Sequence, residues 1–173
     1  MGKNDKKNKT PRKTLIVVRH AHREKDMGRE VDNGLSGKGR KQAERIRKLY
    51  QRRYDQSAPH ILSSAKVRCV ETVMPIANLT GAEVHTSDWL MEKDGIRPES
   101  EKAFRQRVLE FLEWWKRDAP ELTVACSHGD WIPEFFVASV GAAIDLAKGG
   151  WAELGLKNGD PTLELLLQDP SAD

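Results

Sequence analysis

The sequence is short of the features that would assign a chain to a membrane or secreted class. Near its start only Leu15–Val18 is continuously apolar, and no later run approaches the length needed to span a membrane. A secretory signal needs a longer apolar stretch behind its basic residues, so we expect none here. These shortages favour a cytoplasmic protein that has no membrane partner.

Cysteine and net charge are also scarce. Cys69 and Cys126 are too few and too far apart for a disulfide scaffold or a zinc ribbon, so we expect two small core residues in a reducing compartment. The formal net charge is +3, too small to indicate nucleic acid as a partner. In Gly2–Lys13, six basic residues accompany one acid. We expect residues 1–13 to form a disordered tail and residues 14–173 to form one domain.

What the chain does contain is a regular alternation of strand-like and helix-like segments. Thr14–Val18 and Glu121–Ser127 are apolar on both faces, as central strands of a parallel sheet are. Shorter strands are expected at His60–Ser64 and at Glu83–Thr86 on the sheet edge. The expected helices cover residues 36–54, 65–81, 100–118 and 130–141.

The helical segments carry apolar stripes that indicate which face is buried. Ser36 is a suitable N-cap for the first helix, and Gly81 a suitable stop for the second. The expected inner residues of the first are Ala43, Ile46, Leu49 and Tyr50, and those of the second are Val67, Val70, Val73, Met74 and Ala77. Those of the third are Phe104, Val108, Phe111 and Trp115.

The chain ends in a hairpin pattern, in which "WAELGL" and "TLELLLQ" flank a turn at Asn158-Gly159. Strands that alternate with helices before such a hairpin are typical of an α/β protein. We predict a three-layer sandwich, with a mainly parallel central sheet, helices on both of its faces and a C-terminal β-hairpin.

Two buried strands of this sheet run into histidine. The first continues into Arg19-His20, and the later one into Ser127-His128-Gly129. In an open α/β sheet, ligands bind beyond the carboxyl ends of the strands, where both histidines would lie. Arg68 follows a third strand by one helical turn, and its planar fork matches a tetrahedral oxyanion. These residues together predict a phosphate pocket.

Four motifs occur in order over Thr14–Val140: "RHA", "LSGKGRKQA", "SSAKVRCVET" and "SHG". In this set the chain resembles the histidine phosphatase superfamily, also called phosphoglycerate-mutase-like. Ala21 replaces the commonest glycine of the family's "RHG" motif, and the chain lacks the "RHGES-x-x-N" continuation of the sugar-phosphate mutases. It is therefore more similar to the short-chain branch, which includes bacterial phosphohistidine phosphatases.

The resemblance implies roles for individual residues. His20 would be the nucleophile that forms a phosphohistidine, while Arg19, Arg68 and His128 would bind the phosphoryl oxygens. Glu92, in "LMEKDG", matches the position of the proton donor, and Asp94 is close enough in sequence to compete for that role.

Elementary chemistry is consistent with these roles. An imidazole attacks only when it is neutral, and its ordinary pKa of about 6.5 leaves it mostly so at pH 7. We expect Arg19, Arg68 and a charged His128 to lower the pKa of His20 further. The same positive groups would stabilise negative charge on the phosphoryl oxygens.

Other chemistries fit the sequence less well. On a continuing strand His20 and His22 could chelate a metal, but "HAHREKD" lacks the Asp-His pair of such hydrolases, so we expect no metal and place His22 on the lining or rim of the pocket. A cysteine phosphatase needs an arginine six positions after its thiol, where Pro75 and Ile132 stand.

The expected activity is that of a phosphatase with no metal or organic cofactor. It would hydrolyse a phosphomonoester or phosphohistidine, carried by a small molecule or a phosphoprotein, through a covalent intermediate on His20. One alternative is a phosphoglycerate-type mutase. The other is a non-catalytic phosphate-binding module whose lysine-rich tail tethers it to nucleic acid or a membrane.

Overall fold

The structure is a computed structural model that describes residues 12–28 and 30–172. Most of the expected disordered tail, residues 1–11, lies outside the described residues. Where the description begins, Lys13 donates hydrogen bonds from Nζ to the carbonyl oxygens of Trp115 and Lys116, at 3.1 and 3.2 Å. Lys13 therefore contacts the rest of the fold just ahead of the first strand.

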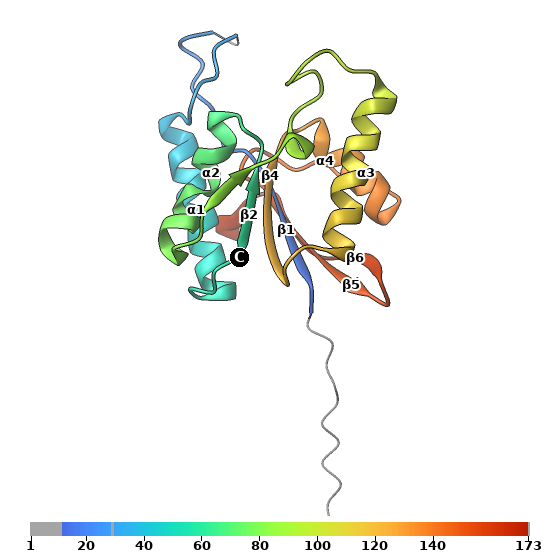
Figure 1. The fold of residues 1–173 in the computed structure, drawn as a ribbon. Coiled ribbons are helices and arrows are strands. Elements are labelled where there is room, and N and C mark those ends of the chain that lie inside the picture. Colours follow the sequence, from blue (N-terminus) through green and yellow to red (C-terminus); the bar gives the residue numbers. More distant parts are fainter. Residues whose placement is uncertain (1–11, 29, 173) are drawn as a thin grey trace, which may run out of the picture.

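Six strands form one mixed sheet in the order β3-β2-β4-β1-β5-β6 (Figure 1). The strands are β1 Thr14–Arg19, β2 His60–Ser63, β3 Val84–Thr86, β4 Leu122–Ser127, β5 Trp151–Lys157 and β6 Asp160–Leu167. The pairs β3·β2, β2·β4 and β4·β1 are parallel, and β1·β5 and β5·β6 are antiparallel. The predicted mainly parallel sheet with a terminal hairpin is confirmed.

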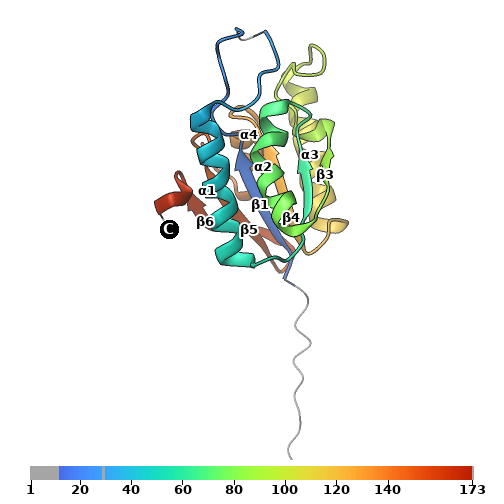
Figure 2. The same ribbon diagram turned by 90° about the vertical axis from the view of Figure 1, so that its left-hand side faces the viewer.

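Four helices cover the two faces of the sheet, α1 and α2 on one side and α3 and α4 on the other (Figures 1 and 2). They are α1 Gly37–Tyr54, α2 Val67–Thr80, α3 Glu101–Arg117 and α4 Trp131–Val140, with short 3-10 turns η1 Asp88–Leu90 and η2 Pro170–Ala172. None of the helices among the described residues is both long and apolar enough to cross a membrane.

The central strand β1 is apolar on both faces because each face meets a different helix pair. Leu15 and Val17 belong to the core formed with α3 and α4, whereas Ile16 and Val18 belong to the core formed with α1 and α2. All four are fully buried, and burying each aliphatic side chain contributes roughly 1.5–3 kcal/mol. This two-sided burial fixes the position of the carboxyl end of β1, where the polar sequence begins.

The predicted caps and most of the predicted inner faces are confirmed. Ser36 Oγ accepts a hydrogen bond from Gly39 N at 3.1 Å at the start of α1, and Gly81 ends α2 with a φ of 74°. The hairpin turn has positive φ at Asn158 and Gly159, 55° and 87°. The expected stripes of α1 and α3 are buried as well.

The predicted inner face of α2 is partly wrong. Val67 and Met74, expected inside, are 39% and 37% exposed. The residues that α2 buries are Arg68, Cys69, Thr72, Val73, Ile76 and Ala77. The valine periodicity misplaced the face because α2 turns Arg68 and Thr72 inward at its first turns, where they contact polar groups rather than the core.

Candidate functional site

The carboxyl ends of β1 and β2 open into a cavity of about 400 Å³. The loops that follow β1 and η1 rise on either side of this end of the sheet (Figure 1). The residues that line the cavity are His20, Arg23, Lys25, Glu30, Val31, Asp32, Lys66, Arg68, Glu92 and Lys148. Three of the residues expected in the site, His20, Arg68 and Glu92, are therefore brought together from β1, α2 and the loop after η1.

His20 is held by its backbone at the end of β1. Its N–H donates to the carbonyl of Ser127 at 3.0 Å, and the next N–H, of Ala21, donates to Thr72 Oγ1 at 2.9 Å. The ring Nδ1 lies 2.8 Å from the Ala21 carbonyl. Because a carbonyl oxygen only accepts, Nδ1 carries the proton, and the lone pair of the neutral ring is on Nε2.

The pKa of His20 is lowered from 6.5 to about 3. Burial is the largest cause, and the charges of Arg68, Arg19 and Lys148 lower it further, while the hydrogen bond to Ala21 opposes them. The predicted direction is confirmed, but removal from water contributes more than the expected cations do. The imidazole is therefore neutral at pH 7.

His128 lies beside His20, with ring centroids 5.3 Å apart. Nδ1 of His128 is 3.2 Å from Arg68 Nη2, and Nε2 of His128 is 2.7 Å from Ser64 Oγ. Since the guanidinium can only donate, Nδ1 accepts and Nε2 carries the proton. Burial, followed by the charge of Arg68, lowers the pKa of His128 to about 2. The expectation of a charged His128 is therefore wrong, because the ring is 2% exposed and faces cations.

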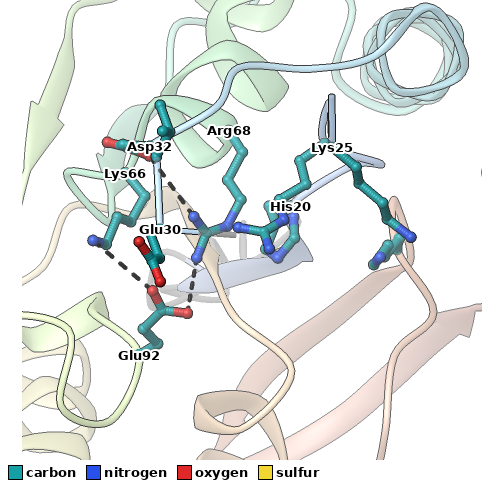
Figure 3. Close-up of a pocket in the computed structure, with 10 residues that line it drawn as sticks. His20, Lys25, Glu30, Asp32, Lys66, Arg68 and Glu92 are labelled. Atoms are coloured by element: carbon teal, nitrogen blue, oxygen red, sulfur yellow. Dashed lines mark hydrogen bonds and ion pairs between the residues drawn. The ribbon is translucent and has the colours of Figure 1, made fainter. Parts of the chain in front are cut away.

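Arg68 connects the site from the first turn of α2. Its Nη2 donates to Glu92 Oε2 at 2.8 Å, and its Nη1 lies 3.7 Å from an Asp32 carboxylate oxygen. Glu92 also has Lys66 Nζ at 4.0 Å and His128 Nδ1 at 3.6 Å. Figure 3 shows Arg68 next to His20, with Glu92, Lys66 and Asp32 on its far side. Arg68 is 5% exposed and lines the cavity.

Arg19 does not line the cavity. Its Nη1 donates to the Leu146 carbonyl at 2.7 Å, and its guanidinium group packs against Gly129. A Cβ atom at Gly129 would lie 2.6 Å from Arg19 Nη2, so a side chain there would displace the arginine. Arg19 Nε is buried and has no hydrogen-bond partner within residues 12–28 and 30–172. The cation is close enough to lower the pKa of both site histidines.

Glu92 and Asp94, the two carboxylates expected to compete, occupy different places. Glu92 lines the cavity, whereas Asp94 is exposed, has a φ of 59° and accepts a hydrogen bond from Glu99 N at 2.8 Å. Of the pair, Glu92 is therefore the carboxylate beside Arg68.

The prediction that His22 lines or rims the pocket is wrong. The strand ends at Arg19, so the alternation that would place His22 beside His20 no longer applies. Nδ1 of His22 instead lies 2.8 Å from Ser36 Oγ, and the His22 carbonyl accepts a hydrogen bond from Ser36 N at 3.0 Å. Gly39 permits this approach of α1, because a Cβ there would lie 1.9 Å from the His22 carbonyl oxygen.

Sequence reasoning missed most of the charged lining, which comprises Arg23, Lys25, Glu30, Asp32, Lys66 and Lys148. Lys148 reaches the cavity because Gly149 N donates to the Arg19 and His20 carbonyls at 3.1 and 3.3 Å. No motif marks this lysine. Lys66 could have been noticed, since it stands two residues before Arg68 in the same motif.

Both cysteines are buried, as expected of core residues. Cys69 Sγ lies 3.5 Å from His128 Nε2. Within the stretch of chain that the structure describes, no group of three or more His, Cys, Asp or Glu residues is arranged to hold a metal ion.

Residues 15–96 match the family model of the histidine phosphatase superfamily, branch 1. This span includes His20, Arg68 and Glu92. No curated protein matches the chain.

Three solved structures are similar over nearly their whole length. A candidate alpha-ribazole-5′-P phosphatase from Escherichia coli K-12 is 17% identical with a TM-score of 0.74, over 90% of this chain and 96% of that one. A mycobacterial glucosyl-3-phosphoglycerate phosphatase is 18% identical with a TM-score of 0.68, over 89% and 98%. A phosphoserine phosphatase from Entamoeba histolytica, in complex with phosphoserine, is 18% identical with a TM-score of 0.69, over 90% and 96%. These likenesses establish the fold.

Proposed function

We propose that the chain is a member of the histidine phosphatase superfamily, whose family model residues 15–96 match, and that it is a phosphatase that works through a covalent phosphohistidine on His20. The observation that carries the proposal is the state of His20, which is a neutral ring with its Nδ1 proton held by the Ala21 carbonyl and its Nε2 lone pair free. A lone pair on a fixed ring at a cationic cavity is what attack on phosphorus requires.

The first step forms one bond and breaks another. The Nε2 lone pair of His20 attacks phosphorus, and the bond from phosphorus to the leaving oxygen or nitrogen breaks. Arg68 stabilises the charge on the phosphoryl oxygens, and the nearby charge of Arg19 adds to it. The carboxyl group of Glu92 donates its proton to a leaving oxygen, which would otherwise depart as an unstable alkoxide.

The second step returns the enzyme to its starting state. Water attacks the phosphorus of phosphohistidine, the P–N bond breaks, and its electron pair returns to Nε2 of His20. The Glu92 carboxylate accepts the proton that the water loses, so inorganic phosphate leaves and the carboxyl group is restored.

Phosphorylated small molecules are the best-supported substrate class. The relatives with similar folds are named for small phosphate esters, including phosphoserine and glucosyl-3-phosphoglycerate. A phosphohistidine or another phosphoprotein is the second class that the same chemistry accommodates, because a neutral histidine leaves readily from phosphorus.

The test is to trap the intermediate. After rapid acid-free denaturation with a radiolabelled aryl phosphate, label should be bound to the wild-type protein as an acid-labile, base-stable adduct. The variant His20→Ala should bind none and should lose about 10,000-fold in kcat. Normal turnover by His20→Ala would refute the mechanism. Release of inorganic phosphate, rather than transfer to a second sugar, separates a phosphatase from the alternative mutase.

The role of Glu92 is tested by the leaving group. Glu92→Gln should slow an alkyl phosphate by about 100-fold or more, because the alkoxide then departs unprotonated. It should slow phosphohistidine much less. Asp94→Asn is the matched control and should leave both rates unchanged. Equal losses on the two substrates, or a larger loss for Asp94→Asn, would remove Glu92 from the role of acid.

A further inference from the structure

One side of the cavity carries three cations that the proposed chemistry does not use. Arg23, Lys25 and Lys148, here called the cationic flank, all line the cavity. Arg23 and Lys148 are half-buried and Lys25 is exposed. Within the described residues, none of the three side chains has a carboxylate within ion-pair distance or a hydrogen bond. They differ in this from the cations across the cavity.

On the other side of the cavity, the cations are paired with carboxylates. Glu92 lies within 4.0 Å of both Lys66 and Arg68, and Asp32 lies within 3.7 Å of Arg68 and accepts from Val67 N at 3.2 Å. Figure 3 shows this group on one side of His20 and Lys25 on the other. The negative charges of the cavity are therefore concentrated away from the cationic flank.

The flank is held in place by a side chain from α1. Gln42 Nε2 donates to the Lys148 carbonyl at 2.9 Å, while Gln42 Oε1 accepts from His22 N at 2.8 Å. The amide thus joins the segment before β5 to the residue before Arg23. Arg23 itself forms an isolated bridge with Leu35, which fixes its backbone.

The three cations are close enough to repel one another. Partial burial, and then the charges of Lys25, Arg19 and Arg23, lower the pKa of Lys148. Like charges held together without a counter-charge favour the binding of an anion, and a dianion more than a monoanion. Arginine adds a planar fork that matches phosphate oxygens.

Resting on the proposed function, we propose that the cationic flank binds a second phosphate group of the substrate, so that the enzyme prefers small molecules that carry two phosphates. His20 takes the reacting phosphoryl group, and Arg23, Lys25 and Lys148 hold the other. A cavity of about 400 Å³ is within the size range of small-ligand sites, which favours a small bisphosphate over a protein.

The test compares butane-1,4-diol bisphosphate with butyl phosphate, which has the same reacting group and chain length. Wild-type kcat/KM should be about 10- to 100-fold higher for the bisphosphate, since a charge-assisted phosphate contact corresponds to one or two factors of ten. Lys148→Met and Arg23→Gln should each lower this preference by about tenfold. Lys41→Met, which removes the same charge from an exposed position of α1 outside the cavity, should leave both rates unchanged.

Each other outcome has a defined meaning. An equal preference in the wild-type protein and in Lys148→Met would overturn the inference and leave the phosphatase assignment intact. The analogue 5-phosphonooxypentanoate carries a carboxylate in place of the second phosphate. If its kcat/KM equals that of the bisphosphate, the choice of a dianion is refuted. If a phosphohistidine peptide has a higher kcat/KM than either small molecule, the proposal that the substrate is a small molecule is refuted.

A binding measurement keeps the inference separate from the reaction. Butane-1,4-bisphosphonate cannot be hydrolysed and should bind the wild-type protein about tenfold more tightly than butylphosphonate, with the advantage lost in Lys148→Met. If neither ester is hydrolysed, the proposed function fails, yet calorimetry with the two phosphonates still decides whether the flank binds a second phosphate.

Discussion

Two arginine–glutamate ion pairs in this protein consist of the same residue types but lie in different surroundings. Arg53 on α1 and Glu153 on β5 form two contacts, at 2.6 and 2.9 Å, and Trp151 Nε1 donates to the same carboxylate at 3.0 Å. Arg68 and Glu92 form one contact at 2.8 Å. The Glu153 side chain is 3% exposed, while that of Glu92 is 33% exposed and lines the cavity.

The difference is between an ion pair enclosed by the fold and an ion pair that faces the cavity of the candidate site. Glu153 has all its partners within the fold, and a buried carboxylate left alone there would be costly. Arg68 instead shares its fork among Glu92, Asp32 and His128, at the edge of a cavity that can admit a phosphoryl group. The carboxylate of the first pair is enclosed by protein groups, whereas the carboxylate of the second pair lines the cavity.

The largest effect is expected on activity, when the Arg68–Glu92 pair is broken. Arg68→Met should lower kcat/KM for an aryl phosphate by about 1,000-fold, since it removes the charge that the proposed mechanism places against the phosphoryl oxygens. Its free energy of unfolding should change by less than about 1 kcal/mol, because site residues are selected for chemistry more than for stability. Steady-state kinetics and urea unfolding measure both. A large loss of stability with normal turnover would contradict the distinction between the pairs.

The reverse pattern is expected for the other pair. Arg53→Met should lower the free energy of unfolding by about 3 kcal/mol, because Glu153 stays buried without its cation. Activity at 25 °C should stay within about twofold of wild type. The double variant Arg53→Met with Glu153→Met should recover most of the stability, since it removes the unpaired charge. A failure of the double variant to recover would show that packing, not charge, is what the pair supplies.

The smallest effect concerns the histidines that burial keeps neutral. The folded pKa of His20 is about 3 against an unfolded value near 6.5, so between these values the unfolded chain binds more protons and stability falls as pH falls. From pH 7 to pH 5, His20 should account for about 2 kcal/mol of that loss. His20→Ala should show a correspondingly flatter decline in urea unfolding, with the contribution of His128 retained. An identical decline in both proteins would mean that His20 is not held neutral.

Much of the fold could be predicted because its signals are local. The two-sided apolar run of β1, the cap at Ser36 and the Asn158-Gly159 turn each depend on a few neighbouring residues. The face of α2 could not be predicted in the same way. Its buried Arg68 is polar, and periodicity counts only apolar side chains.

In the candidate site too, local patterns predicted some residues correctly and others wrongly. Strand ends and motifs were enough to select His20, Arg68 and Glu92, which do share the cavity. They were not enough for His22, whose position depends on where the chain turns after β1. They also gave the wrong charge for His128, because its pKa is set mainly by burial.

The sequence by itself determined the order of strands and helices and the chemical types at the strand ends, since these follow from residue patterns over short spans. Only the tertiary structure decided which charges meet. Arg23 and Lys148 come from segments far apart in the chain, and Gln42 joins these segments through hydrogen bonds with the His22 N–H and the Lys148 carbonyl. Electrostatic energy depends on distance and burial, and neither is a property of a residue's place in the sequence.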